Sequence, residues 1–303
     1  MAYVPPTIIK SKKEIPMKKR SLITASTVSV FILSSSAFAA SENYKHVSDE
    51  VIAEQRHVLA KTTDDLGFGP QSPRDIDVIG GTNHRIFGAA PAHTEMNLCN
   101  IHFHKNAEHK GGEFTTYAGN GDSHGYGTGF KYNNLLTDAE LATYKHKVGV
   151  TDHGDLVPGD TIEVHYVHTT AKVEPGSTLG SCLSKAISNP QLRVEAQIYV
   201  IVNDNNALDF VKLTHHEVVN GLHQAINIPE NTGKPVQYAG STTGPSYNKK
   251  GSPFQVTWSV RPQVAKVSIS SIKTWLQGNT FDEDHAHGVR NLIINPDLLS
   301  AIK

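Results

Sequence analysis

Alternation of apolar and polar residues predicts that this chain is built mainly from β-strands. Five segments combine a period of two residues with β-branched or aromatic side chains, the pattern of strands in a buried or half-buried sheet. These segments are Leu98–His104, Thr161–His168, Arg193–Val202, Phe210–Thr214 and Gln255–Val260. We therefore expect a mainly β (α+β) fold, with a few helices at its periphery.

Helical patterns are sparse. Start and stop signals predict short helices over Ser48–Lys61, Asp138–Lys147 and Ser268–Leu276. Gly111–Gly129 holds seven glycines and is predicted to be a long loop, which in a compact domain is usually functional or mobile. No repeat or low-complexity linker divides the rest of the chain, so we expect a single domain over residues 40–303.

The first 39 residues are predicted to be a leader and a secretory signal peptide. Basic residues in Met17–Arg20 precede an apolar run over Ser21–Leu33, and small residues follow at Ala37 and Ala39. The apolar run is too short for a good transmembrane helix. We expect cleavage after Ala39, export to the periplasm or the exterior, and no membrane partner for the mature chain.

Net charge and composition point to a small substrate. A formal net charge of -1 gives no electrostatic reason to expect nucleic acid or an anionic membrane as a partner. Histidine is in excess, at 17 of 303 residues, and several histidines stand in close pairs. The pairs are His102/His104, His215/His216 and His285/His287.

Two cysteines, Cys99 and Cys182, are the only ones in the chain. In an exported protein the simplest expectation is one disulfide between them, although two buried free thiols stay open as an alternative. Neither cysteine stands in a Cys-x-x-Cys pair, so we expect neither a redox motif nor a cysteine-ligated zinc site.

The strongest candidate for chemistry is a set of histidines on two predicted strands. His102 and His104 are two residues apart, so both imidazoles project from one face of their strand. His165 lies on the next predicted strand and is able to complete a set of three. Three imidazoles with one open position form a catalytic arrangement for Zn²⁺.

Two residues beside these histidines strengthen the prediction of a metal site. Asn100 and Glu163 each stand two positions before a candidate ligand and share its face. A ligating histidine usually donates its second ring N–H to such a partner, so we expect Asn100 to orient His102 and Glu163 to orient His165. A merely polar sheet face is the alternative interpretation, and the paired Glu-x-His motif argues against it.

Ordered sequence blocks resemble the carbonic anhydrases of the alpha class and, more closely over Ile101–Lys110, those of the delta class. The blocks are Gln71–Asp77 (Q-S-P-R-D-I-D), Asn100–His104 (N-I-H-F-H), Glu163–His168 (E-V-H-Y-V-H), Gly240–Pro245 (G-S-T-T-G-P) and Val256–Trp258 (V-T-W). They follow the family's order and span most of the chain after the leader. The first block serves the scaffold in the family.

This resemblance implies a carbonic-anhydrase-like single domain around a large, mostly antiparallel, twisted central sheet. It also implies a zinc lyase that reversibly hydrates carbon dioxide to bicarbonate and a proton through a zinc-bound hydroxide. His102, His104 and His165 would hold one Zn²⁺ per chain, with cobalt or cadmium as substitutes. His168 would be a buried second histidine of its strand.

Two further site residues follow from the resemblance. Glu113, in Gly-Gly-Glu-Phe-Thr, is similar to the glutamate of the family's G-S-E-H-T motif, which accepts a hydrogen bond from a threonine hydroxyl. Thr243 fits that threonine when Gly240 and Pro245 are both kept in register. Thr242 stays open as the alternative.

The chain departs from the alpha-class pattern between His104 and His165, where 60 residues indicate an insertion. A third ligand from this insertion therefore stays open as an alternative; its histidines are His109, His124, His146 and His153. Two other functions also compete: a non-catalytic carbonic-anhydrase-like protein, and a periplasmic protein that stores or delivers zinc. The complete set of three ligands favours the enzyme. No pattern predicts the oligomeric state.

Overall fold

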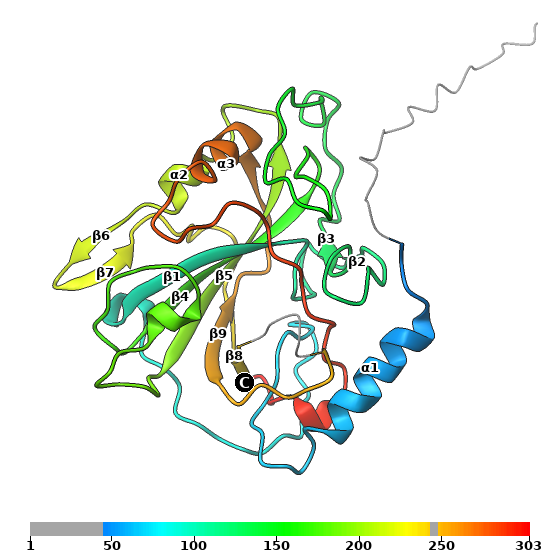
Figure 1. Ribbon diagram of the computed structural model, residues 1–303, viewed down its shortest axis with the longest axis vertical. Helices are drawn as coiled ribbons and strands as arrows, with labels where there is room; N and C mark the ends of the chain where they lie inside the picture. The colour runs from blue at the N-terminus through cyan, green and yellow to red at the C-terminus, as the bar shows by residue number, and fades with distance from the viewer. Residues whose placement is uncertain (1–44, 243–247) are drawn as a thin grey trace, which may run out of the picture. The chain divides into compact units, whose positions relative to one another are not determined.

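The computed structural model describes residues 45–242 and 248–303. The chain divides into residues 1–39 and residues 40–303, and the fold below belongs to the second part. Within the described residues, six strands form one sheet in the order β1-β4-β5-β9-β8, with β10 also paired to β5 (Figure 1). These strands are β1 (Asn97–Lys105), β4 (Thr161–Thr169), β5 (Leu192–Val202), β8 (Val236–Ser241), β9 (Gln255–Val260) and β10 (Ala265–Ser268).

Strand directions in this sheet are mixed. The β1–β4, β4–β5 and β8–β9 pairs are antiparallel, while β9 and β10 both pair with β5 in parallel. The mainly β fold is confirmed, as are four of the predicted strands. The fifth prediction, a strand over Phe210–Thr214, is wrong because this segment forms the helical turn α2 (Phe210–Leu213). The Asp209 carboxylate caps that turn by accepting a hydrogen bond from the N–H of Val211 at 2.9 Å.

Two of the three predicted helices form: α1 (Asp49–Lys61) and α3 (Ile269–Trp275). The prediction over Asp138–Lys147 is wrong. Thr137 and Glu140 do make the reciprocal hydrogen bonds that begin a helix, at 2.8 and 3.3 Å. The segment continues as turns, and Leu141 remains exposed, so no apolar face is buried to stabilise further helical turns.

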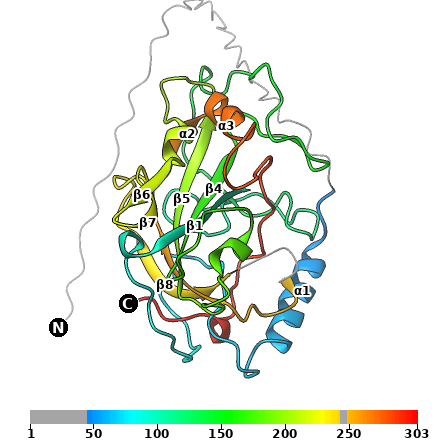
Figure 2. The ribbon, with the colours of Figure 1, turned by 60° about the vertical axis from the view of Figure 1, so that its left-hand side comes forward.

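Several short elements lie outside the main sheet and its helices. They are the 3₁₀ turns η1 (His93–Glu95), η2 (Leu179–Cys182) and η4 (Pro296–Leu298), the paired strands β2 (Thr116–Tyr117) and β3 (Phe130–Lys131), and the hairpin of β6 (His216–Val219) and β7 (Leu222–Ala225). Figures 1 and 2 show α2 and α3 together at one end of the sheet and the β6–β7 hairpin beside β1. No helix among the described residues is long and apolar enough to span a membrane.

Hydrophobic side chains pack on both faces of the sheet, so its central strands are buried throughout. On one face, Ile101 and Phe103 of β1 belong to a cluster that also contains Trp275 of α3. On the other face, Val167 of β4 and Trp258 of β9 belong to a second cluster. Period-two alternation therefore sends the even-numbered histidines of β1 toward the second cluster.

The predicted disulfide between Cys99 and Cys182 is confirmed. It joins β1 to the last residue of η2, and both cysteines are fully buried. Within β1 and β4 the pairing shifts between Leu98 and Asn100, which makes Cys99 the extra residue of a β-bulge.

Candidate metal centre

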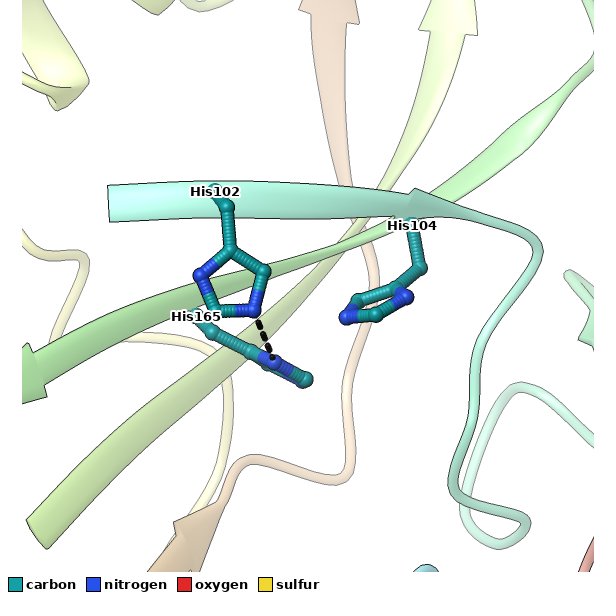
Figure 3. A group of neighbouring side chains, drawn as sticks. All are labelled: His102, His104 and His165. Carbon is teal, nitrogen blue, oxygen red and sulfur yellow. Dashed lines mark hydrogen bonds between the residues drawn. The ribbon is translucent and has the colours of Figure 1, made fainter. Parts of the chain in front are cut away.

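Strands β1 and β4 bring His102, His104 and His165 together on one face of the sheet (Figure 3). His102 stands directly opposite His165 in the antiparallel register, and His104 stands opposite Glu163. The ring centroids of the three imidazoles lie 4.7–5.2 Å apart. One nitrogen from each ring lies within 4.8 Å of the others, which suits the ligand atoms of one metal ion. Strand periodicity predicted the shared face of His102 and His104, and the antiparallel pairing of β1 with β4 brings His165 beside them.

Each of the three imidazoles uses one ring nitrogen in a hydrogen bond to an acceptor. Nδ1 of His102 lies 2.6 Å from Oδ1 of Asn100, and Nδ1 of His104 lies 2.8 Å from the carbonyl oxygen of Gly288. Nε2 of His165 lies 2.8 Å from Oε1 of Glu163. Since a carbonyl or carboxylate oxygen only accepts, the ring nitrogen donates in each case, and a neutral ring then has a lone pair on its other nitrogen.

These three lone pairs converge on one point. Nε2 of His102 and Nδ1 of His165 lie 3.3 Å apart, and Nε2 of His104 is buried with no hydrogen-bond partner among the described residues. Facing lone pairs and an unpartnered buried acceptor are unfavourable by themselves, and a cation between them removes both costs. The donor set therefore fits a metal ion such as Zn²⁺.

Burial keeps the imidazoles of His102 and His104 neutral. It lowers the pKa of His102 well below its ordinary value, and neighbouring His165 and His104 lower it further. Burial also lowers the pKa of His104 to about 4, although the carboxylate of Glu108 opposes this shift. Neutral imidazole is the form that ligates a metal, so the environment prepares both rings to bind.

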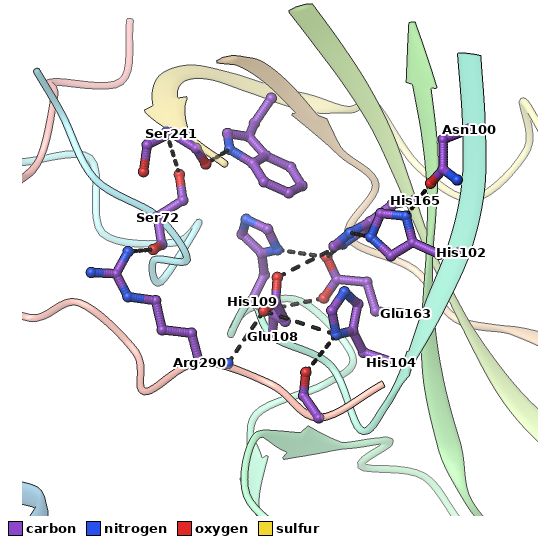
Figure 4. A network of polar contacts seen from close by, with 12 residues as sticks. Ser72, Asn100, His102, His104, Glu108, His109, Glu163, His165, Ser241 and Arg290 are labelled. Atoms are coloured by element: carbon purple, nitrogen blue, oxygen red, sulfur yellow. Dashed lines mark hydrogen bonds and ion pairs between the residues drawn. The ribbon is translucent and has the colours of Figure 1, made fainter. Parts of the chain in front are cut away.

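The predicted contact from Glu163 to His165 is present, and the structure adds His109 to it (Figure 4). Nδ1 of His109 lies 2.6 Å from Oε1 of Glu163, and the backbone N–H of His109 donates to Oε2 at 3.0 Å. Burial raises the pKa of Glu163, but its electrostatic and hydrogen-bond interactions with His109 and His165 outweigh this effect and hold that pKa well below its usual value. An ionised Glu163 is thus shared by two imidazoles, which makes His109 a support of the site.

Besides Glu163, the carboxylate that lies beside the candidate ligands belongs to Glu108 and not to the predicted Glu113. Oε1 and Oε2 of Glu108 lie 4.0 Å from Nδ1 of His104 and from Nε2 of His165, and the residue is buried. Glu113 instead accepts a hydrogen bond from the backbone N–H of Val264 at 2.8 Å. A signal was available, because Glu108-His109 carries the Glu-His dipeptide of G-S-E-H-T, whereas Glu113 precedes phenylalanine.

Thr243, the predicted threonine, lies outside the described residues. The alternative, Thr242, is buried, and its hydroxyl oxygen lies 3.1 Å from that of Ser252. The Q-S-P block supports the nearby backbone as expected of a scaffold: Ser72 accepts a hydrogen bond from the N–H of Ser241 and its carbonyl accepts one from Arg290 (Figure 4).

The histidines of the insertion do not replace His165 in the three-imidazole group. His153 stacks on Tyr126 at 3.6 Å between ring centroids, and the His146 ring lies beside Tyr144 at 5.5 Å. His168 is buried, as predicted, and it lies on the opposite sheet face with Nδ1 3.0 Å from the carbonyl oxygen of Tyr166.

A fourth histidine beside the cluster was missed. The His287 ring lies 5.7 Å from the His102 ring and 5.9 Å from the His104 ring. Its backbone N–H donates to the carbonyl of Phe103 at 2.9 Å, and its Nε2 lies 2.7 Å from Oε2 of Glu283. The His-x-His pair at residues 285 and 287 was the sequence signal.

Comparison with known proteins agrees with this geometry. The family model "Delta carbonic anhydrase" matches residues 93–271, more than half of the chain. No curated protein sequence gives a significant match.

Three solved structures are similar at low identity. The first is a hyperthermostable carbonic anhydrase from an active hydrothermal vent chimney, with 16% identity over 76% of this chain and 87% of that chain and a TM-score of 0.27. The second is the alpha-carbonic anhydrase of Thermovibrio ammonificans in complex with sulfanilamide, with 17% identity over 74% of this chain and 84% of that chain and a TM-score of 0.25. The third is the alpha-carbonic anhydrase of Photobacterium profundum, with 13% identity over 82% of this chain and 96% of that chain and a TM-score of 0.26. TM-scores this low do not establish a common fold.

Proposed function

Because this chain belongs to the delta carbonic anhydrase family and is a carbonic anhydrase, we propose that it reversibly hydrates carbon dioxide at a zinc ion held by His102, His104 and His165. The observation that carries the zinc site is the convergence of three imidazole lone pairs. Each arises because the other ring nitrogen is already hydrogen-bonded, to Asn100, to Gly288 and to Glu163 respectively.

Zinc in such a site supplies a hydroxide nucleophile at neutral pH, the established chemistry of carbonic anhydrases. The residues of this chain hold and shield the site. Asn100, the Gly288 carbonyl and Glu163 fix the tautomer and direction of the three imidazoles, and Trp258 packs against the His165 ring at 5.0 Å between centroids. Burial of these groups keeps water away from the ligands and strengthens their electrostatic interactions.

We assign to Glu108 the role that the resemblance gives to a glutamate, which is to accept a hydrogen bond from a threonine hydroxyl. Its Oε1 accepts a hydrogen bond from the backbone N–H of Arg290 at 3.2 Å, which fixes the carboxylate beside His104 and His165. A threonine hydroxyl that donates its hydrogen bond to this carboxylate leaves its own oxygen to accept a hydrogen bond from the nucleophile, and it would so orient the nucleophile. Thr243 remains our choice for that hydroxyl.

Export is part of the proposal. The Cys99–Cys182 disulfide supports it, since such bonds persist in oxidising compartments. The periplasm or the exterior is therefore the proposed location of the enzyme.

Stopped-flow measurement of carbon dioxide hydration tests the proposed function. We expect one zinc per chain, activity that an arylsulfonamide inhibits, and loss of both zinc and activity in His104→Ala. A folded protein that binds zinc at this stoichiometry without hydration activity would refute the catalytic proposal, and wild-type protein that binds no zinc would refute the metal centre.

A further inference from the structure

We propose that the Cys99–Cys182 disulfide and the loop that it closes position the metal ligand His102, through Gly176 and Asn100. This inference rests on the proposed metal site and adds a covalent support to it. The support links the loop between β4 and η2 to the ligand strand β1. Its parts are adjacent on β1, where Cys99 directly precedes Asn100 and His102 follows two residues later.

The side chain of Asn100 connects the ligand to the loop. Its Oδ1 lies 2.6 Å from Nδ1 of His102, and its Nδ2 donates a hydrogen bond to the carbonyl oxygen of Gly176 at 2.9 Å. A carbonyl oxygen only accepts, so Gly176 must face the amide NH₂ group of Asn100. The opposite end, the oxygen, is thereby turned toward His102, where it accepts the ring N–H. Without Gly176, rotation of the carboxamide by half a turn would place an NH₂ group against that N–H.

Gly176 is itself held against β1. Its backbone N–H donates to the carbonyl oxygen of Cys99 at 3.0 Å, so its two polar backbone groups bracket the Cys99–Asn100 peptide. Cys99 is the extra residue of the β-bulge, and at such a residue the regular pairing with β4 is interrupted. The bulge thus makes the Cys99 carbonyl available to the loop.

The disulfide closes the far end of this loop. Cys182 is bonded to Cys99, and its carbonyl oxygen accepts a hydrogen bond from the hydroxyl of Thr169 at 2.8 Å. The near end is tied by Asn97, whose Nδ2 donates to the carbonyl of Val173 at 2.7 Å. Between Val173 and Cys182, where the loop is attached, the described chain has no regular structure apart from the four-residue turn η2. Opening the disulfide therefore removes the covalent attachment that keeps Gly176 beside Asn100.

A double-mutant cycle on zinc affinity tests the proposal. The variants are Cys99→Ala/Cys182→Ala, Asn100→Ala and their combination, each titrated with zinc against a competing chelator. We expect Asn100→Ala to weaken zinc binding roughly 10- to 100-fold, and the disulfide variant to weaken it on the order of 10-fold. When Asn100 is already alanine, removal of the disulfide should change affinity less than about twofold, because both act through one contact. An equal effect in both backgrounds, or none in the first, would overturn the proposal.

General loss of stability is separated from positioning by a matched control. Ile272→Ala truncates a fully buried side chain in the cluster on the opposite sheet face. It should lower the unfolding midpoint and leave zinc affinity unchanged. The visible spectrum of the cobalt-substituted protein gives a second readout: it should change in the disulfide variant and not in Ile272→Ala. If wild-type protein binds no zinc, the metal centre itself fails; if wild type binds zinc and the cycle is additive, only the positioning role fails.

Asn100→Asp keeps the inference testable if the disulfide variant does not fold. It retains an acceptor for His102 but places a carboxylate oxygen against the Gly176 carbonyl. We expect weaker zinc binding than in the wild type, because the anchor to the loop is lost. Wild-type or tighter binding in Asn100→Asp would show that the contact with Gly176 does not position the ligand.

Discussion

His109 and Glu163 form a hydrogen-bonded pair with no exposed side-chain surface, at 2.6 Å between Nδ1 and Oε1. The same carboxylate oxygen lies 2.8 Å from Nε2 of His165. Glu163 thus orients the imidazole of His165 and is itself held in place by His109. His109 in turn contacts Tyr238, with 2.7 Å between its Nε2 and the tyrosine hydroxyl. The support of the metal centre extends from β4 to β8 through these contacts.

Glu163→Ala should weaken zinc affinity roughly 10- to 100-fold, because His165 loses the acceptor that fixes its tautomer. Competition with a chelator measures the change. Glu163→Gln is the matched control, since it retains an acceptor oxygen and should lose less affinity. Unchanged zinc affinity in Glu163→Ala would exclude the orienting role.

His165→Ala should lose both stoichiometric zinc and carbon dioxide hydration, because two imidazoles do not form the three-ligand face that holds Zn²⁺. Metal analysis of purified, folded protein checks this. His124→Ala, His146→Ala and His153→Ala should each keep one zinc per chain. His109→Ala should also keep zinc, with reduced affinity, as its contact is to Glu163. Zinc retained in His165→Ala and lost in one of the first three variants would assign the third ligand to the insertion.

Glu108 and Glu113 make a matched pair of variants for testing which glutamate accepts the hydrogen bond of the threonine. Glu108→Ala should retain zinc and lower kcat by about 10²-fold, because the threonine hydroxyl that orients the nucleophile loses its acceptor. Glu113→Ala removes a contact to Val264 and should leave kcat near that of the wild type. Stopped-flow hydration with both zinc-loaded variants compares them. The opposite ranking would assign this role to Glu113.

Stability of the zinc-free protein should fall in acid partly because of His168. Burial, aided by His93, lowers its pKa from 6.5 to about 3. Between pH 6.5 and pH 3 the unfolded chain binds a proton at His168 that the folded chain does not bind. The contribution of His168 to stability is therefore fully present above pH 6.5 and is lost as the pH falls toward 3. One such group contributes a slope of at most about 1.4 kcal/mol per pH unit.

His168→Gln removes this titration, although it also perturbs packing. Denaturant unfolding at pH 7.5 and pH 5 should therefore show a smaller loss of stability in the variant than in the wild type. If the wild type and His168→Gln lose the same stability between pH 7.5 and pH 5, His168 would already be protonated in the folded protein at pH 5.

N-terminal sequencing of protein from its native host should begin at Ala40 or within a few residues of it. The basic, apolar and small-residue regions that end at Ala39 predict this cleavage. A protein that keeps Met1 or Met17 as its terminus in the cytosol would contradict the proposed export.

A period of two residues was sufficient to place His102 and His104 on one face of their strand, while the choice of His165 rested on the neighbouring Glu163 and on the family resemblance. Asn100 and Glu163 followed from the same spacing. Glu108 did not, since its position depends on the bend after β1, where Asn106 adopts a left-handed backbone conformation with φ of 68°. Phe210 was misassigned because a capping aspartate outweighed the β-propensity of the residues after it.

The direct pairing of His102 with His165 makes the centre sensitive to strand register. A slip of one residue between β1 and β4 would turn His102 and His104 toward the face now occupied by Ile101 and Phe103. An ion that requires all three imidazoles binds only the correctly aligned chain, and its binding free energy favours that alignment alone. Metal loading would then help the folding chain to discriminate against misaligned sheets.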